Sequence, residues 1–490
     1  MVPSQVQQVD IDASIPPTPD EKPSSMETVN PEKPWDATQL PWARKIHIII
    51  AGFTCTFNGN LGSSMPSGAL DALSEHFSVT RRLDLTLLNS LYMVGYVLGP
   101  LLFGPLSEYI GRRPVLIGTF CGYLAMMLAC SGAPNFSALL AFRLLCGICA
   151  AAPTTVISGL YADILDVPSH RGTAMAVYMS VTTMGPLAGP IVSGFASIPS
   201  WRWPFWVAAM IAALGLPLVL TIPETFAPVL QNREAKRRQK EGAAGGESGA
   251  AEPVELHAFN PRKIFLRPAY LLVTEPILLS TSLYLTLAYA VFYLMFQAYP
   301  IVFQDLYGLE PGIAGLAYIP IGVGVIASMV IFWAYTSYYD RAVKEDKAWA
   351  KREIYRRLPI ACIASPLMVV ALFWLGWLAQ PNLSPIIPSL GGFFWGIGFQ
   401  LIFMGMSNYI TDVFTHMSAS AQAAAACMRS VGAIFLPMAA APMYRDLGRH
   451  WAPSLLGFVA LAMGVIPFVF IRYGDDLAKR SKYARRLYGQ

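Results

Sequence analysis

The chain has 490 residues, of which 54% are hydrophobic and 13% are charged, against roughly 25% charged in an ordinary soluble domain. A soluble protein could not cover so much apolar surface, so the composition indicates that lipid is the solvent. The net charge of +5 comes from short basic clusters beside apolar runs, which argues against nucleic-acid binding. The seven cysteines have no paired spacing, so neither a disulfide framework nor a zinc site is expected.

The chain begins with about 40 polar residues rich in Pro, Ser, Asp and Glu. Such a composition cannot bury enough apolar surface to fold, so we predict a disordered cytoplasmic tail over residues 1–44. No secretory signal precedes the first apolar run, which would act as an uncleaved signal anchor.

Twelve apolar runs follow, each long enough to cross the hydrocarbon core of a membrane as a helix. The first six lie near 46–66, 85–106, 114–133, 136–162, 173–197 and 203–222. The second six lie near 277–304, 312–338, 358–379, 385–411, 419–443 and 453–472. We therefore predict an all-α membrane protein with two pseudo-symmetric six-helix bundles, over residues 45–222 and 276–473. A cytoplasmic linker over 223–275 would join them, and 474–490 would form a cytoplasmic tail.

The basic residues predict the orientation of these spans, because cytoplasmic loops carry an excess of Lys and Arg. If the N-terminal tail is cytoplasmic, all but seven of the 35 Lys and Arg residues fall on the cytoplasmic side. Arg143 and Arg429 lie within spans, and the outer loops hold Arg81, Arg82, Arg202, Arg445 and Arg449. Both termini are therefore predicted to be cytoplasmic.

The turn between the second and third spans reads GPLSEYIGRRP, residues 104–114. Gly104 lets a helix end approach a neighbour, Gly111 permits a left-handed turn, and Pro114 suits the first turn of a helix. The charges of this turn, on Glu108, Arg112 and Arg113, can pair at the membrane interface. By its residues alone, the stretch is as well explained as a simple helix connector with arginines on the cytoplasmic side as it is by a functional charge cluster.

This turn resembles the G-x-L-[S/A]-[D/E]-x-x-G-R-[R/K] loop signature of the major facilitator superfamily, which lies between the same two helices. The resemblance implies the fold of that superfamily. It also implies a cytoplasmic ion-pair latch between the two halves in the outward-facing state. Glu108 and Arg112 would form the pair, and Asp163 in LYADIL would be the third charge. Gly104 and Gly111 would frame the turn, and Arg113 completes the cluster.

Two further stretches resemble motifs of twelve-span proton antiporters in this superfamily. MGPLAGPIVSG, residues 184–194, is similar to G-x-x-x-G-P-x-x-G-G, with Gly185, Gly189 and Pro190 matching. Its small residues recur every fourth position, so close helix packing is an alternative role. In RLLCGICAAAP, Arg143 and Gly147 match R-x-x-x-G. Over about residues 41–483 the chain resembles the fungal drug:proton antiporter family with twelve spans, whose members export drugs, polyamines and metabolites.

The resemblance implies a secondary active transporter that exports a drug, toxin, secondary metabolite or polyamine by proton antiport and alternating access. It implies a monomer in the plasma membrane, or alternatively the vacuolar membrane, with the solute and protons as partners and no cofactor. An uncoupled exporter and a proton-coupled importer are the alternatives. A polytopic membrane enzyme is a remote one, because the six histidines form no metal-type pair. The absence of a Walker loop argues against an ATP-driven pump.

Arginines within spans are the first candidates for contact with the solute, because an arginine at mid-membrane costs about 3 kcal/mol. Arg143 could hold an anionic solute or change how readily a nearby carboxylate keeps its proton. Alternatively, neighbouring carbonyls cap it or it snorkels outward. Arg429 could serve packing or contact the cavity. The other candidates are Asn58, Asn89, Tyr92, Gln297, Tyr299, Gln400 and Asn408, each of which could instead form an interhelical hydrogen bond. No acid lies plainly at mid-membrane, so proton coupling is implied by the resemblance alone.

Overall fold

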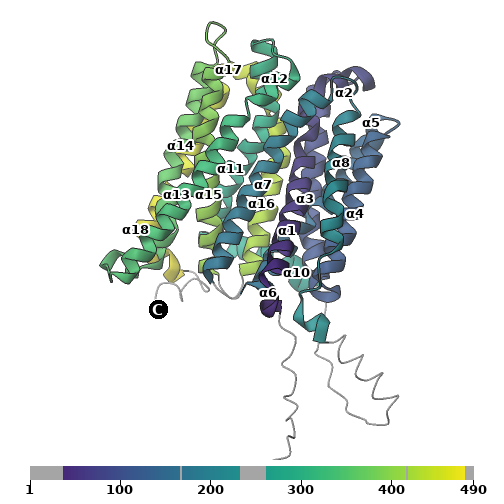
Figure 1. Ribbon diagram of the computed structural model, residues 1–490. Coiled ribbons are helices and arrows are strands. Elements are labelled where there is room, and N and C mark those ends of the chain that lie inside the picture. Colours follow the sequence, from purple (N-terminus) through teal and green to yellow (C-terminus); the bar gives the residue numbers. More distant parts are fainter. Residues whose placement is uncertain (1–36, 166–167, 232–260, 415–417, 481–490) are drawn as a thin grey trace, which may run out of the picture.

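Long helices run side by side through the computed structural model, which describes residues 37–165, 168–231, 261–414 and 418–480 (Figure 1). The described residues contain no strand. The predicted all-α architecture is therefore confirmed. Most of the predicted N-terminal tail, much of the linker and the last ten residues lie outside the described residues.

The first half of the chain supplies six spans. They are α1 (Trp42–Ser64), α3 (Arg82–Ile110), α4 (Arg112–Ser131), α5 (Phe136–Ala150) with α6 (Ala152–Ile164), α7 (Pro168–Ala196) and α8 (Trp203–Leu220). Shorter helices beside them are η1 (Ala37–Gln39), η2 (Met65–Gly68) and α2 (Leu70–Phe77). The break in the fourth span comes just before Pro153, which has no N–H to donate to a continuing helix.

The second half repeats this order after α10 (Pro261–Thr274), a helix within the predicted linker. Its spans are α11 (Pro276–Tyr299) with η3 (Pro300–Leu306), α12 (Pro311–Leu316) with α13 (Ile319–Lys344), α14 (Leu358–Leu378), α15 (Ile386–Val413), α16 (Ser418–Met438), and α17 (Ala440–Met463) with α18 (Ile466–Arg480). Two short turns, η4 (Ala348–Lys351) and η5 (Glu353–Arg356), precede α14. Gly448 breaks α17 with a φ of 76°.

Eleven helices among the described residues are long and apolar enough to cross a membrane. The remaining span of the predicted twelve is α1, which packs against α7 and α8. Its second half carries Asn58, Asn60, Ser63 and Ser64, all buried, and these polar residues lower the hydropathy of the helix. Boundaries differ from the predicted ones at several ends. For example, α13 runs on to Lys344, and α1 begins at Trp42.

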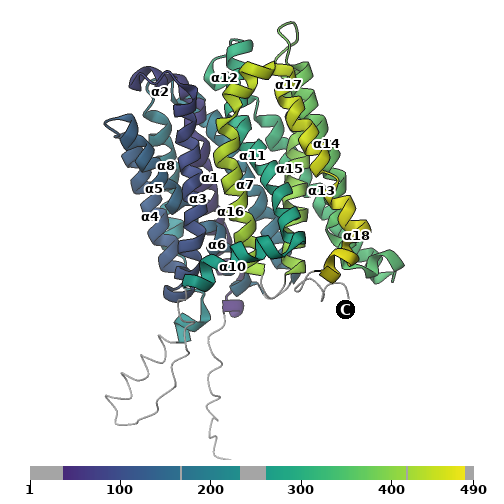
Figure 2. The same cartoon turned by 180° about the vertical axis from the view of Figure 1, so that it is seen from behind.

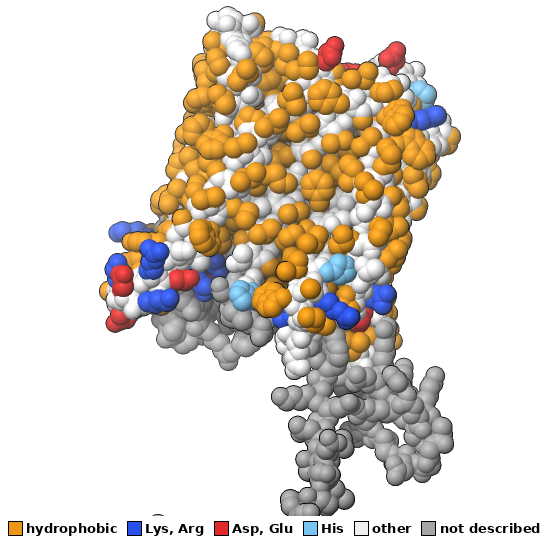
Figure 3. Space-filling model, in the orientation of Figure 1, with side chains coloured by type: hydrophobic (Ala, Val, Ile, Leu, Met, Phe, Trp, Pro, Cys, Tyr) orange, Lys and Arg blue, Asp and Glu red, His pale blue; other side chains and the backbone are white. Residues whose placement is uncertain are grey.

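The face of the bundle drawn in Figure 3 is mainly hydrophobic, and its charged side chains lie towards the two ends. Large apolar side chains stand outward from the middle of spans, such as Leu214, 82% exposed, and Trp333, 69% exposed. Such a surface would drive aggregation in water, so it fits a lipid environment.

The two ends of the bundle differ. The end at the bottom of Figure 1, called the lower end here, holds the start of α1 and the end of α18, the first and last described helices that span the bundle. The upper end holds α2 and α12. Helix α10 lies at the lower end (Figure 2), where it packs against α16 and α11 and also contacts α3 of the other half.

Candidate functional site

A one-residue turn at the lower end joins α3 to α4. Gly111 stands between the two helices with a φ of 108°, which L-residues with a side chain rarely adopt. A Cβ at this position would also meet the carboxylate of Glu224. Glycine is therefore required here on both grounds, as expected from the turn.

Arg112, the first residue of α4, is held by partners from the same half of the molecule. Its Nε lies 3.4 Å from Oδ2 of Asp163, at the end of α6. Its Nη1 donates a 2.9 Å hydrogen bond to Oγ of Ser107, and the guanidinium lies 5.0 Å from the ring centre of Phe226. The structure thus brings Arg112 and Asp163 together, two of the three charges that the resemblance implied for the latch.

Glu224 is a central residue of this cluster that the sequence analysis did not single out. It is 6% exposed, and its carboxylate accepts hydrogen bonds from the backbone N–H groups of Arg112 (2.9 Å) and Arg113 (3.2 Å). These are the first N–H groups of α4, which no residue within the helix can pair. Glu224 therefore caps α4 from a distance, and its negative charge complements the helix dipole. The available signal was the IPETF stretch directly after the sixth span.

The structure does not bring Glu108 to Arg112. Helix α3 continues to Ile110 and places Glu108 on its exposed face, where it pairs with no described residue. Arg113 is also exposed, and it donates to the Leu220 carbonyl at 3.5 Å. Gly104 lies half-buried beside Thr155. Among the described residues, the acid of the turn therefore has no ion-pair partner at the lower end.

An equivalent ion pair lies in the second half. Nε of Arg357, directly before α14, lies 3.0 Å from Oδ2 of Asp412 near the end of α15. Each pair thus links the start of the third span of its half to the end of the fourth. This second pair was not predicted from the sequence. The available signal is an arginine shortly before a proline, in both RRP and RRLP.

The small-residue stripe of α7 packs against α1. A Cβ on Gly185 would lie 2.7 Å from Cβ of Asn60, and one on Gly189 would overlap Oγ of Ser64. Ser64 also donates a 2.7 Å hydrogen bond to the Pro186 carbonyl. Pro190 lies next to α12 of the other half, where its carbonyl approaches Gly315. The residues of this motif therefore pack closely against a neighbouring helix.

Arg143 is fully buried, and each of its three guanidinium nitrogens donates a hydrogen bond. Its guanidinium donates to three backbone carbonyls, those of Leu88 (3.0 Å), Gly62 (2.7 Å) and Ser63 (3.0 Å), and lies 4.4 Å from the ring centre of Tyr92. Tyr92 in turn donates to the Gly59 carbonyl at 2.5 Å. Among the described residues no carboxylate pairs with Arg143. The arrangement corresponds to the alternative in which carbonyls cap the arginine.

Two of the predicted polar residues, Gln400 and Gln297, form hydrogen bonds between the two halves. Gln400 of α15 accepts from Thr183 of α7 at 2.6 Å and donates to Ser180 at 3.4 Å. Gln297 of α11 accepts from Thr86 of α3 at 3.4 Å. Nearer the upper end, Arg82 and Asp305 form a 2.7 Å ion pair, and Ser63 lies 3.0 Å from the Tyr293 hydroxyl. These bonds lie in the middle and upper parts of the bundle.

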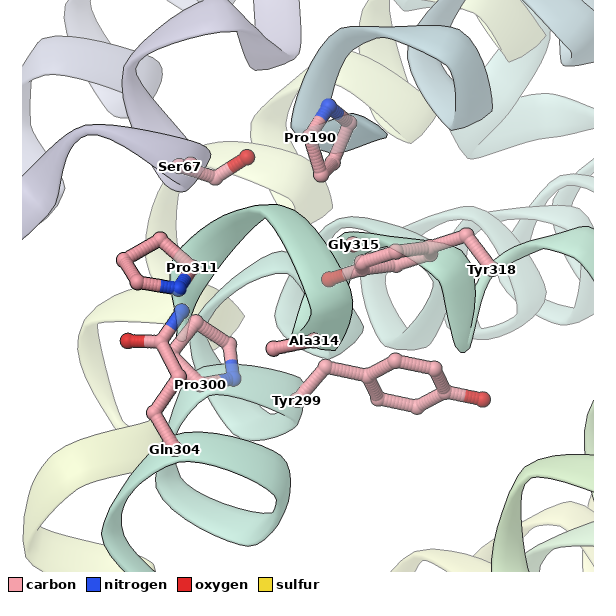
Figure 4. A pocket seen from close by; sticks show the side chains of 10 residues that line it. Ser67, Pro190, Tyr299, Pro300, Gln304, Pro311, Ala314, Gly315 and Tyr318 are labelled. Carbon is pink, nitrogen blue, oxygen red and sulfur yellow. The ribbon is translucent and has the colours of Figure 1, made fainter. Parts of the chain in front are cut away.

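Among the described residues, the other predicted polar residues form no hydrogen bond with the opposite half. Asn58 donates to the Thr54 carbonyl within α1. Asn89 is buried with an unpaired Oδ1, and Asn408 is half-buried. Tyr299 lines a small pocket near the upper end, beside Tyr318 and across from Pro190 (Figure 4). Its cavity volume of about 10 Å³ has room for about one water molecule, far less than a small organic compound needs.

Arg429 differs from Arg143 in its burial and in its hydrogen bonds. It lies midway along α16 and is half-buried. Its guanidinium is 5.0 Å from the ring centre of Phe403 and 5.9 Å from that of Tyr289. Its Nη1 is buried, and no described residue accepts a hydrogen bond from it. The structure therefore leaves one arginine in a span without an acceptor.

Comparison with known proteins identifies the family of this chain. A profile of the Major Facilitator Superfamily matches residues 52–437. The chain is 34% identical over 459 residues to the efflux pump FUB11 of Gibberella moniliformis, covering 93% of this chain and 77% of that protein. It is 35% identical over 438 residues to the MFS-type transporter traF of Penicillium crustosum, covering 89% and 88%. It is 32% identical over 482 residues to the efflux pump radE of Floropilus chiversii, covering 97% and 89%.

A solved structure supports the fold. The proton:xylose symporter XylE bound to 6-bromo-6-deoxy-D-glucose matches with a TM-score of 0.64 at 17% identity, covering 89% of this chain and 96% of XylE. The named relatives are transporters and pumps, so the enzyme alternative is set aside. The chain is a membrane transporter and belongs to the Major Facilitator Superfamily.

Proposed function

We propose that this transporter exports a small organic compound in exchange for protons, by alternating access. The compound would be a drug, toxin, secondary metabolite or polyamine. Support comes from relatives at 32–34% identity that carry the name efflux pump and align with most of this chain. Proton exchange is proposed from the resemblance of the 184–194 stretch to an antiporter motif.

The observation that carries the proposal is the uneven bonding between the halves. Side chains join them in the middle and at the upper end, as in the Gln400–Thr183 and Arg82–Asp305 pairs. At the lower end, the Arg112–Asp163 and Arg357–Asp412 pairs each stay within one half, and Glu108 pairs with no described residue. Rocking of one half against the other would break the bonds between the halves at the upper end and form new ones at the lower end. Glu108 would join a latch when the lower end closes.

Acids for proton exchange would come from the lower-end clusters. Asp163 and Asp412 have partly buried side chains, 22% and 34% exposed, each beside an arginine. A conformational change that separates either carboxylate from its arginine would make that carboxylate easier to protonate. An uncoupled exporter would not need such a change, and an importer would use it in the opposite direction.

The lower end is proposed to face the cytoplasm. Basic side chains gather there on the face drawn in Figure 3, as the positive-inside rule expects of cytoplasmic loops. The protein would act as a monomer in the plasma membrane, with the vacuolar membrane as the alternative.

The test is flux into liposomes that contain the purified protein, with anionic, neutral and cationic fluorescent solutes and an imposed pH gradient. Antiport predicts accumulation of a solute in acid-inside liposomes. Accumulation only when the outside is acid would indicate an importer, and flux indifferent to the gradient would remove proton coupling. Arg445→Gln, which changes an exposed upper-end arginine, serves as the matched control and should transport normally.

A further inference from the structure

Arg429 is a cation placed midway across the bundle without a hydrogen-bond acceptor. The middle of α16 carries it between Phe403 of α15 and Tyr289 of α11. Its Nη1 is buried and unpaired among the described residues. Burying a guanidinium without an acceptor is costly. A protein that retains one has either a structural partner or a ligand that supplies the acceptor.

No described residue provides a hydrogen-bond acceptor for this arginine. Tyr289, Tyr178 and Cys427 lie near Arg429, and no carboxylate among the described residues forms an ion pair with it. Arg143 shows how this chain satisfies an arginine that serves the fold, with three backbone carbonyls and no exposure. Arg429 has none of these bonds and remains partly accessible.

The surroundings of Arg429 come from both halves of the molecule. Tyr178 belongs to α7 of the first half, whereas Tyr289 and Phe403 belong to the second. Tyr96 of α3 lies near Tyr289 and Tyr178, and its buried hydroxyl has no hydrogen-bond partner among the described residues. Two unpaired donors, Arg429 and Tyr96, thus lie close to the same tyrosines where the halves meet.

We propose that Arg429 binds an anionic group, a carboxylate or a phenolate, of the transported compound, whose apolar part packs on the rings of Tyr289 and Phe403. The inference rests on the proposed export function and narrows its substrates to organic anions. A planar guanidinium suits a carboxylate, which can accept two of its N–H groups at once. The same positive charge repels cations, so polyamines are removed from the range of substrates.

The test is binding to the purified full chain in lipid nanodiscs. The probes are a ladder of aromatic carboxylates, benzoate, 2-naphthoate and anthracene-2-carboxylate, each paired with its carboxamide. We expect at least one carboxylate to bind more tightly than its amide. Arg429→Gln should abolish that preference, a loss of about 10- to 100-fold in carboxylate affinity with little change for the amide. Arg429→Lys should keep part of it, and Arg445→Gln should keep all of it.

The result that overturns the inference is that no carboxylate in the ladder binds more tightly than its amide, or that Arg429→Gln leaves the preference intact. The amide arm reports folding, because a misfolded variant would lose both members of a pair. Since binding needs neither a gradient nor transport, the outcome is separate from that of the export proposal. Proton-driven flux of neutral or cationic solutes without anion preference would sustain export and reject anion recognition by Arg429.

Discussion

Replacement of Glu224 by Gln should loosen the start of α4 selectively. Oε1 of Glu224 accepts from the backbone N–H groups of Arg112, Thr225 and Phe226, and Oε2 accepts from that of Arg113. Gln replaces one of these oxygens by a donor and removes the charge. One lost charge-assisted bond contributes about 1.5–3 kcal/mol, and the lost interaction with the helix dipole about 0.3–1 kcal/mol. The expected loss is therefore about 2–4 kcal/mol of local stability.

Amide hydrogen exchange measures this loss directly. A local loss of about 2–4 kcal/mol speeds exchange by about 30- to 700-fold at the amides whose opening it controls. We expect this acceleration at Arg112 and Arg113, and unchanged exchange in α2 at the upper end. Glu345→Gln, at an exposed lower-end carboxylate paired with Lys347, is the control and should leave α4 unaffected. Wild-type exchange rates at Arg112 and Arg113 in Glu224→Gln would refute the capping role.

Three further predictions concern the latch, the buried arginine and the helix stripe. Glu108→Ala should leave the melting temperature unchanged, because Glu108 pairs with no described residue, and should impair flux, because the latch would lose its acid. Arg112→Ala should lower both the melting temperature and the flux. Normal flux in Glu108→Ala at normal expression would reject the latch. Arg143→Ala should destabilise the protein by about 3–5 kcal/mol, more than Arg143→Lys, because three charge-assisted bonds are lost, and equal melting temperatures would point to a non-electrostatic role. Gly189→Ala should destabilise by about 1–3 kcal/mol through overlap with Ser64, and Ser64→Gly should restore the melting temperature if that contact is the cause.

The spans were predictable from sequence, because a membrane helix needs about 20 apolar residues and few other structures need runs of that length. The ends of the helices were harder to predict. The spans of α13 and α15 run into polar loops, and the polar second half of α1 lowers its hydropathy without ending the helix. The turn at Gly111 was also predictable, since its spacing is local.

Contacts of the site were predictable only where both residues belong to a sequence motif or where a motif implies the second residue. Glu224 caps a helix that begins 112 residues earlier in the chain, and no local pattern announces such a contact. The two arginines show the same limit. Arg143 and Arg429 both interrupt apolar spans, yet carbonyls of α1 and α3 satisfy one and no described residue accepts from the other. Only the packing of distant helices decides which of the two arginines receives hydrogen-bond acceptors from the described residues.

Paired distance measurements across both ends of the bundle test alternating access most directly. After replacement of the seven native cysteines, which form no disulfide in the structure, spin labels at Tyr109 and Tyr338 report the lower end. Labels at Leu83 and Ile313 report the upper end; all four positions are exposed. Alternating access predicts that a transported solute or a pH change shortens the lower distance while it lengthens the upper one. Two distances that stay fixed, or that change in the same direction, would contradict it.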